Sequence, residues 1–296
     1  MIMKKTGFIA IVGRPNVGKS TLLNTILGEK VAIVSAKPQT TRNRITGIHT
    51  DGENQFVFID TPGIFTPRNK LGDYMVTSAE DTMKDADAVI LVVEAGYNPG
   101  KVETDVIAYL KSSGAQSILA INKTDLCDAE KIGDTITKYA ALHDFDAVVP
   151  LCAKNGKMVK ALLDECSKFL SESEWFFPDD MLTDQPERQI AAEVIREKLL
   201  RALDKEVPHG IAVVIEEFKD ETTMLSIRAE IFCEKESHKG IIVGKRGETL
   251  KRVGSYARQD LEKMFGIKVY LNLWVKVKEN WRDSANLVGN FGYRDE

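Results

Sequence analysis

Short, unbroken runs of apolar residues alternate with helical stretches through the first half of the chain. The runs lie at residues 8–12, 55–59, 88–93, 118–121 and 147–149, and residues 44–49 indicate one further strand. Runs of this kind are typical of strands that are buried on both faces, as in parallel sheets covered by helices. The alternation therefore predicts a doubly wound α/β domain with a mostly parallel sheet.

The pattern changes near Trp175, where acidic, proline-containing sequence through Pro186 predicts a connector. An apolar stripe at helical spacing over residues 191–202 follows, and then strands at 211–215 and 224–232. A second helical stripe at 250–264, a strand at 268–277 and a helical tail from Trp281 complete the chain. The order α-β-β-(α)-α-β, with an optional helix before the 250–264 stripe, predicts a small α+β domain. We expect a first domain at 1–175, a linker at 176–188 and a second domain at 189–296, with Trp274 and Trp281 in its core.

The composition agrees with two ordinary globular domains. The chain has 296 residues, with 43% hydrophobic and 28% charged, and one domain usually takes roughly 150 residues. These values exclude a disordered tail protein, a collagen-like repeat and a disulfide miniprotein. No apolar run is long enough for a membrane span, and we expect no signal peptide.

The cysteines indicate neither a zinc knuckle nor a redox pair, because no two of them have the C-x-x-C spacing. We therefore expect a reducing, cytoplasmic location. The four residues are Cys127, Cys152, Cys166 and Cys233.

The net charge of −4 excludes nucleic-acid binding through the overall field of the protein. Residues 238–258 nevertheless form a local basic patch, because they contain six basic side chains and Glu248 as the one acidic side chain. Any nucleic-acid contact is therefore expected at this patch.

A P-loop pattern, G-x-x-x-x-G-K-[ST], follows the first apolar run and precedes a helical stretch. Its glycines let backbone N–H groups turn towards phosphate oxygens, and the start of the helix adds its dipole. Lys19 would reach the β- and γ-phosphates, and Ser20 would ligate Mg²⁺. The predicted phosphate-binding residues are Gly13, Arg14, Pro15, Asn16, Val17, Gly18, Lys19, Ser20 and Thr21.

A D-x-x-G element, formed by Asp60, Thr61, Pro62 and Gly63, follows another apolar run. Asp60 would hold Mg²⁺ through water, and the Gly63 N–H would contact the γ-phosphate. Ile64 comes next, in the place where Ras-like proteins carry the glutamine that orients the attacking water. Because isoleucine cannot bond a water, hydrolysis should be slow unaided, or should use a backbone group, a bound cation or a partner.

Two further residues would complete the metal sites. A threonine between the P-loop and D-x-x-G should ligate Mg²⁺ and respond to the γ-phosphate. We favour Thr41, which directly precedes Arg42, but Thr40 remains an alternative. Asn16 is a candidate ligand for a monovalent cation such as K⁺, with a loop-stabilising role as the alternative.

An N-K-x-D element, formed by Asn122, Lys123, Thr124 and Asp125, predicts selectivity for guanine. The Asp125 carboxylate only accepts hydrogen bonds, so it suits the N1–H and 2-amino donors of guanine, which adenine lacks. The Asn122 amide can serve N7, and the Lys123 stem can cover the base. A backbone N–H to O6 is expected from Cys152-Ala153, where the usual pattern is Ser-Ala. For the Cys152 side chain, a buried structural thiol and a special role remain equal alternatives.

The basic patch contains G-x-x-G between two helical stretches, which is the pattern of a KH domain. The two glycines would let a phosphodiester approach closely, and a basic pair between them would supply charge. The predicted RNA-binding residues are Ile241, Ile242, Val243, Gly244, Lys245, Arg246, Gly247 and Lys251, with a partial core role as the alternative for the three apolar residues.

With these residues in hand, nearly the whole chain resembles the Era family, bacterial P-loop GTPases with a C-terminal KH domain. The matching segments are 13–20, 39–42, 60–63, 122–125, 177–188 with 192–199, 244–247 and 273–278. A single P-loop argues against the related tandem double-GTPase family. The resemblance implies a type II KH domain, binding near the 3′ end of 16S ribosomal RNA and assistance in assembly of the 30S ribosomal subunit. It also implies peripheral association with the inner membrane. A hydrophobic residue at the position of Ile64 is likewise what the resemblance implies.

We therefore expect a monomeric two-domain GTPase in which GTP–Mg²⁺ orders the loops around Thr41 and residues 63–71, and hydrolysis to GDP releases them. Lys19, Thr41 and Gly63 would be the catalytic residues. One alternative is a constitutive RNA-binding chaperone for which nucleotide is only a structural ligand. Another is a tRNA-modification or membrane-traffic GTPase whose second domain grips a different partner.

Overall fold

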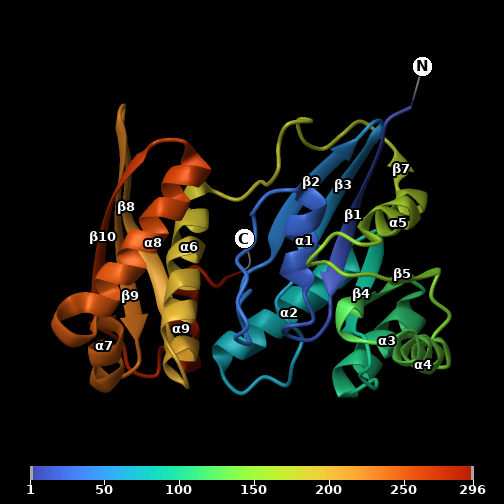
Figure 1. Ribbon diagram of the computed structural model, residues 1–296, viewed down its shortest axis with the longest axis horizontal. Coiled ribbons are helices and arrows are strands. Elements are labelled where there is room, and N and C mark those ends of the chain that lie inside the picture. The colour runs from blue at the N-terminus through green and yellow to red at the C-terminus, as the bar shows by residue number, and fades with distance from the viewer. Residues whose placement is uncertain (1–2, 295–296) are drawn as a thin grey trace. The chain divides into compact units, whose positions relative to one another are not determined.

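The computed structural model of the protein describes residues 3–294 (Figure 1). The chain divides into two compact units. The first contains residues Met1–Thr66 and Met75–Asp184, and the second contains Pro67–Tyr74 and Gln185–Glu296. Each unit has its own apolar core, as two independent domains require.

A seven-stranded sheet forms the centre of the first unit. Strands β3, β1, β4, β5 and β6 pair in parallel, and β2 is antiparallel to β3 at one edge. The predicted parallel sheet is thus confirmed, including the strand expected at 44–49. The strands are β1 (Lys5–Val12), β2 (Ile45–Asp51), β3 (Asn54–Asp60), β4 (Ala88–Glu94), β5 (Gln116–Asn122), β6 (Ala147–Pro150) and the short β7 (Ser171–Glu172), which pairs with β1.

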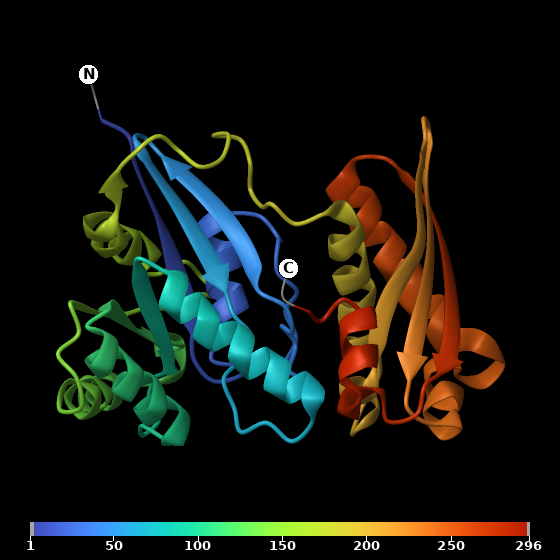
Figure 2. The same cartoon turned by 180° about the vertical axis from the view of Figure 1, so that it is seen from behind.

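Helices cover both faces of this sheet (Figures 1 and 2). Successive residues of β1 point to opposite faces, so Ile9 and Ile11 join one core cluster while Ala10 and Val12 join the other. The first cluster packs under α1 (Lys19–Leu27) and α5 (Val159–Cys166). The second packs under α2 (Lys70–Asp85), α3 (Lys101–Ser113) and α4 (Ala129–Ala140).

The strand register brings the predicted motifs to one edge of the sheet. Ile11 at the end of β1 pairs with Asp60 at the end of β3, and Glu94 pairs with Asn122 at the end of β5. Because the carboxyl ends of parallel strands meet at one edge, the P-loop, D-x-x-G and N-K-x-D elements converge there.

The second unit packs helices on one face of a three-stranded sheet ordered β10-β9-β8, in which β10 is parallel to β9. The predicted order α-β-β-α-α-β is confirmed. Its elements are α6 (Glu187–Ala202), β8 (Ala212–Glu221), β9 (Met224–Cys233), α7 (Glu236–Val243), α8 (Glu248–Phe265), β10 (Lys268–Val277) and α9 (Ala285–Asn290). Single 3₁₀ turns lie at Thr124–Leu126, Ser167–Phe169, Val207–Gly210, Lys245–Gly247 and Trp281–Asp283.

The two tryptophans of the second unit differ in environment. Trp281 is fully buried, and its indole N–H donates to the Gly210 carbonyl at 2.9 Å. Trp274 is 59% exposed, so its predicted place in the core is wrong. It lies at an outward position of β10, because Val269 and the alternate residues after it face the helices.

Part of the predicted linker packs along the edge of the first sheet. The Gln55 side chain exchanges two hydrogen bonds with the backbone of Phe177, at 2.8 and 3.1 Å. The Ile48 N–H donates to the Leu182 carbonyl at 2.9 Å, and Thr183 donates to the Thr46 carbonyl at 2.7 Å. These bonds hold the segment up to Asp184 on the first unit.

Within residues 3–294, no helix has the length and apolar character needed to span a bilayer. All four cysteines are free.

Candidate functional site

The P-loop backbone is shaped by its glycines. Gly13 has φ 144°, and a Cβ there would lie 2.3 Å from the Val92 carbonyl oxygen. Gly18 has φ 103°, and a Cβ there would lie 2.2 Å from the Asn122 amide nitrogen. Both positions therefore exclude a side chain, which explains the two fixed glycines of the motif.

Lys19 is buried beneath this loop at the edge of a cavity of about 370 Å³. Its ammonium donates to the carbonyl oxygens of Gly13 and Arg14, both at 3.1 Å. Burial lowers the pKa of Lys19 to about 8, against the opposing influence of the Asp60 charge. A buried cation of this kind is suited to bind an anionic phosphate that enters the cavity.

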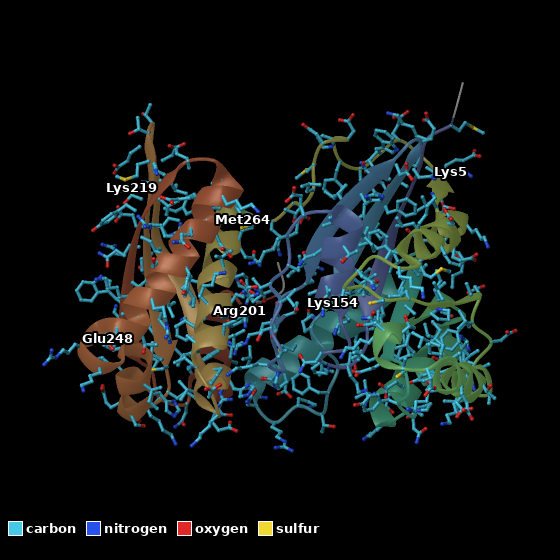
Figure 3. All side chains as sticks on the ribbon, in the orientation of Figure 1. Lys5, Lys154, Arg201, Lys219, Glu248 and Met264 are labelled. Carbon is cyan, nitrogen blue, oxygen red and sulfur yellow. The ribbon has the colours of Figure 1, made fainter. Side chains whose placement is uncertain are left out.

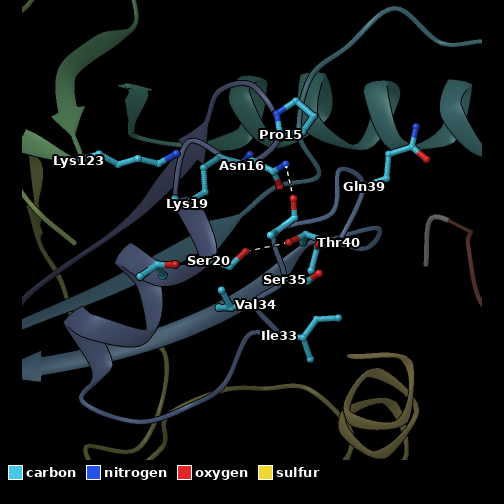
Figure 4. A pocket seen from close by; sticks show the side chains of 15 residues that line it. Pro15, Asn16, Lys19, Ser20, Ile33, Val34, Ser35, Gln39, Thr40 and Lys123 are labelled. Carbon is cyan, nitrogen blue, oxygen red and sulfur yellow. Dashed lines mark hydrogen bonds between the residues drawn. The ribbon is translucent and has the colours of Figure 1, made fainter. Parts of the chain in front are cut away.

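The oxygen-bearing side chains of Ser20, Thr41 and Asp60 meet beside Lys19. Figure 4 labels Ser20 and draws its hydrogen bond as a dashed line. The Ser20 hydroxyl lies 2.8 Å from the Thr41 hydroxyl and donates to Asp60 at 2.5 Å. The second carboxylate oxygen of Asp60 is buried with no hydrogen-bond partner among the described residues. Burial also raises the pKa of Asp60 to about 6. A hard cation such as Mg²⁺ matches this set of oxygens.

The geometry distinguishes the two candidate threonines. Thr41 joins Ser20 and Asp60, whereas the Thr40 hydroxyl donates to the Lys37 carbonyl at 2.6 Å. The structure therefore favours Thr41 as the metal ligand.

The D-x-x-G segment lies directly against the P-loop. A Cβ on Gly63 would come within 2.7 Å of Pro15, so this glycine permits the close approach of the two loops. The Ile64 N–H donates to the Gly13 carbonyl at 3.1 Å, and its side chain packs into the core. Thr61 anchors the segment by donating to the Ile11 carbonyl. The Ile64 side chain thus faces away from any water in the cavity.

Asn122 connects three loops: the P-loop, its own N-K-x-D loop and the 151–154 loop. Its amide nitrogen donates to the Val17 carbonyl at 2.8 Å, and its oxygen accepts from the Ala153 N–H at 2.9 Å. The residue is therefore a structural tie, and one amide hydrogen remains for the N7 contact predicted from the sequence.

The other residues of the base site are also held in place. The Lys123 ammonium pairs with Glu94 at 2.7 Å, and the Thr124 hydroxyl donates to a backbone carbonyl of the 151–154 loop. The buried Cys152 thiol donates to a carboxylate oxygen of Asp125 at 3.1 Å. Sequence reasoning left Cys152 between a buried structural thiol and a special role, and the structure adds this specific contact.

The basic turn of the second unit has two glycines with different constraints. A Cβ on Gly244 would lie 2.3 Å from the Thr249 hydroxyl, whereas a Cβ on Gly247 would meet nothing within 4 Å. Both have positive φ, at 76° and 81°. Lys245 and Arg246 between them are exposed. The turn opens directly into α8, whose first residue Glu248 is labelled in Figure 3.

A groove of about 630 Å³ runs from this turn between α8 and the edge strand β10. Gly247 and Lys251, two of the predicted RNA-binding residues, line it. Most of the lining was not predicted, because it lies on a helix face and on a strand distant in sequence. The lining residues are Gly247, Leu250, Lys251, Gly254, Ser255, Arg258, Val269, Tyr270, Leu271, Asn272 and Leu273. One sequence signal could have pointed to the groove: Gly254 lies within the basic patch at residues 238–258, where a residue without a side chain leaves room on the helix surface.

The apolar residues before the turn divide between surface and core. Ile241 is 51% exposed, and Val243 is partly buried. Ile242 is fully buried in the core of the second unit. Its predicted RNA contact is therefore corrected to a packing role, since a buried side chain cannot meet a base.

Both units match known protein families. Residues 8–123 match the family described as 50S ribosome-binding GTPase, and residues 206–282 match the KH domain family. GTPase Era of Ruminiclostridium cellulolyticum is 49% identical over 291 residues, which cover 98% of each chain. GTPase Era of Clostridioides difficile is 48% identical over 297 residues, which cover 99% of this chain and 100% of that protein.

Two solved structures match nearly the whole chain, each with a TM-score of 0.95 and 40% identity. One is Era in complex with MgGDPNP and nucleotides 1506–1542 of 16S ribosomal RNA, and the match covers 99% of this chain and 100% of the Era chain. The other is an Aquifex aeolicus Era variant bound to GDP and AlF₄⁻, and it covers 98% and 100%.

Proposed function

Since the chain belongs to the Era family of GTPases, we propose that it is a GTP-controlled switch that binds 16S ribosomal RNA near its 3′ end and assists assembly of the 30S subunit. The observation that carries the proposal is the presence, in one chain, of a guanine-directed phosphate cavity and a basic G-x-x-G turn beside a groove. The cavity fits a nucleoside triphosphate, and the turn with its groove fits single-stranded RNA.

In this proposal the P-loop holds the phosphates and Lys19 neutralises the developing charge on the γ-phosphate. Ser20 and Thr41 ligate Mg²⁺, and Asp60 holds it through water. The Mg²⁺ assignment is supported by the Asp60 carboxylate, which contacts the hydroxyls with one oxygen and leaves the other, buried oxygen without a hydrogen-bond partner in the described part of the chain. Thr41 and the Gly63 N–H then link the two switch loops to the γ-phosphate.

The attacking water has no side-chain partner at position 64, because Ile64 is buried. We assign its positioning to a backbone group, a cation or a partner. Asn16 is the candidate ligand for a K⁺ ion in this role. Its left-handed backbone (φ 66°) places it on the cavity wall, where its amide nitrogen donates to the Ala36 carbonyl.

For the RNA, we propose that a phosphodiester approaches the 244–247 turn and that bases enter the groove between α8 and β10. A KH turn clamps about four nucleotides. The proposed contacts are the residues Ile241, Val243, Gly244, Lys245, Arg246, Gly247 and Lys251, together with the groove residues that the structure adds.

The domain bounds rest on the change of sequence pattern near Trp175, and the cytoplasmic location rests on the cysteine spacing. The remaining elements of the proposal rest on the family resemblance. Residues 1–175 are assigned as the nucleotide domain, 176–188 as the connector and 189–296 as the RNA-binding domain. The protein is proposed to act as a cytoplasmic monomer on the 30S subunit, with peripheral attachment to the inner membrane.

Removing the Cys152 thiol should weaken guanine selectivity, because this thiol donates to the carboxylate that reads the base. We expect Cys152→Ala to raise the Kd for GTP about fivefold, which corresponds to ~1 kcal/mol, the value of an ordinary hydrogen bond. The Kd for ITP, which lacks the 2-amino group, should change less. Cys152→Ser supplies a hydroxyl donor and should restore selectivity. Equal losses for GTP and ITP in titration calorimetry would instead indicate a packing role.

The proposed switch is tested by measuring affinity for a 16S 3′-end RNA fragment with GTP analogue, with GDP and with no nucleotide. We expect at least an about threefold difference between states, because coupling requires GTP to stabilise one arrangement more than GDP does. Identical affinities would support a constitutive RNA chaperone. Preferential recovery of tRNA or lipid in crosslinking would support a GTPase with a different partner.

A further inference from the structure

The loop between α1 and β2 carries Thr41 and therefore the proposed magnesium switch. Its first residues are not part of any helix or strand, so no helix or sheet hydrogen bonds hold them and other contacts have to do so. Asn24 is placed to do so, because it lies one turn beyond Ser20 on the same face of α1.

The Asn24 side chain makes three hydrogen bonds to the start of this loop. Its oxygen accepts from the Val31 N–H at 3.0 Å and from the Ala32 N–H at 2.8 Å. Its nitrogen donates to the Ala32 carbonyl at 2.8 Å. One amide thus satisfies both backbone groups of Ala32, whose methyl is fully buried in the core.

Two other contacts of the loop lie at the cavity. The Asn16 amide donates to the Ala36 carbonyl at 3.0 Å, and Ser20 contacts Thr41 at 2.8 Å. Figure 4 shows both contacts at the wall of the cavity. Both lie where nucleotide and Mg²⁺ would bind, so their partners must adjust on binding. The Asn24 contacts involve residues that do not line the cavity.

We propose that Asn24 is a positioning residue for the switch loop, a fixed anchor that confines nucleotide-dependent movement to residues 33–41. The inference rests on the proposed GTP switch. With the start of the loop fixed, a shorter segment has to be ordered when Thr41 meets Mg²⁺ and the γ-phosphate, so less conformational entropy is lost. Without the anchor, the competent loop conformation is a smaller fraction of the ensemble and apparent GTP affinity falls by that fraction.

Two variants separate the three bonds. Asn24→Ala removes all of them, whereas Asn24→Asp keeps an acceptor for the two N–H groups but replaces the donor to the Ala32 carbonyl by an oxygen. In the nucleotide-free protein, we expect hydrogen exchange at the Val31 and Ala32 amides to accelerate at least about tenfold in Asn24→Ala and much less in Asn24→Asp. Ser112→Ala, which removes an exposed hydroxyl bond within α3, is the control.

The second measurement compares nucleotides. Because GDP has no γ-phosphate to engage the loop, Asn24→Ala should leave GDP affinity within about twofold and lower affinity for a GTP analogue with Mg²⁺ about tenfold. The affinity of Asn24→Asp for the GTP analogue should lie between the affinities of Asn24→Ala and the unchanged protein.

Two outcomes would overturn the anchor. One is unchanged exchange at Val31 and Ala32, and the other is an equal loss of GDP and GTP affinity, which would place the effect of Asn24 in the P-loop. Failure of the unchanged protein to bind GTP would refute the proposed function instead. The exchange result needs no nucleotide, so it would still decide whether Asn24 holds the loop.

Discussion

Replacing Gly247 by Asp is expected to lower affinity for the 16S 3′-end RNA fragment at least about tenfold at moderate salt, since a carboxylate would repel the approaching phosphate. Filter binding at several salt concentrations measures the effect. The position suits the experiment because an added Cβ meets no atom within 4 Å. Its φ of 81° is a conformation that aspartate tolerates better than most residues.

Gly247→Asn is the matched control, because it has nearly the same size and backbone tolerance as aspartate but no charge. We expect it to lose less RNA affinity than Gly247→Asp. Guanine-nucleotide affinity should remain unchanged in both variants. RNA affinity that is undiminished in Gly247→Asp would remove the turn from the RNA site. Gly244 would be a poor choice for this test, since any side chain there meets the Thr249 hydroxyl.

Replacing Asp125 by Asn is expected to raise the Kd for GTP by a factor of about 10² to 10³, from the loss of charge-assisted bonds to the base. The carboxylate accepts from both N1–H and the 2-amino group, whereas an asparagine amide turns a donor towards these donors. XTP carries an oxygen in place of the 2-amino group, so its affinity should rise. Competition titration with GTP, XTP and ATP measures the change.

Asp134→Asn, an exposed substitution on α4, is the control for the change of charge and should bind GTP normally. The Cys152 thiol can donate to an asparagine oxygen as well, so the Asp125→Asn side chain should remain held in the site. Unaltered preference for GTP in Asp125→Asn, or ATP binding as tight as GTP binding in the unchanged protein, would contradict the guanine assignment.

The strand positions and the nucleotide motifs could be predicted from the sequence for local reasons. Buried parallel strands such as β4 and β5 read as continuous apolar runs. The P-loop requires glycine at positions 13 and 18 because a Cβ there would collide with the Val92 carbonyl oxygen and with the Asn122 side-chain amide. The basic charge around the 244–247 turn is equally local, since its residues are close in sequence.

What required the tertiary structure is every feature that joins residues far apart in the chain. The choice of Thr41 over Thr40 depends on which hydroxyl reaches Asp60, nineteen positions after Thr41, and the sequence alone has no signal for side-chain direction in a loop. The burial of Ile242 and the exposure of Trp274 were decided by the faces that their elements present to the core.

The sequence by itself therefore predicted the chemistry of this protein: a triphosphate loop, an acceptor for guanine and a basic turn for RNA. The tertiary structure decided how these groups are held. The Cys152–Asp125 bond, the Asn24 anchor and the groove along β10 each arise where folding places distant segments side by side. The physical reason is that propensity and periodicity report neighbours along the chain, whereas hydrogen bonds between loops depend on the distances that packing sets.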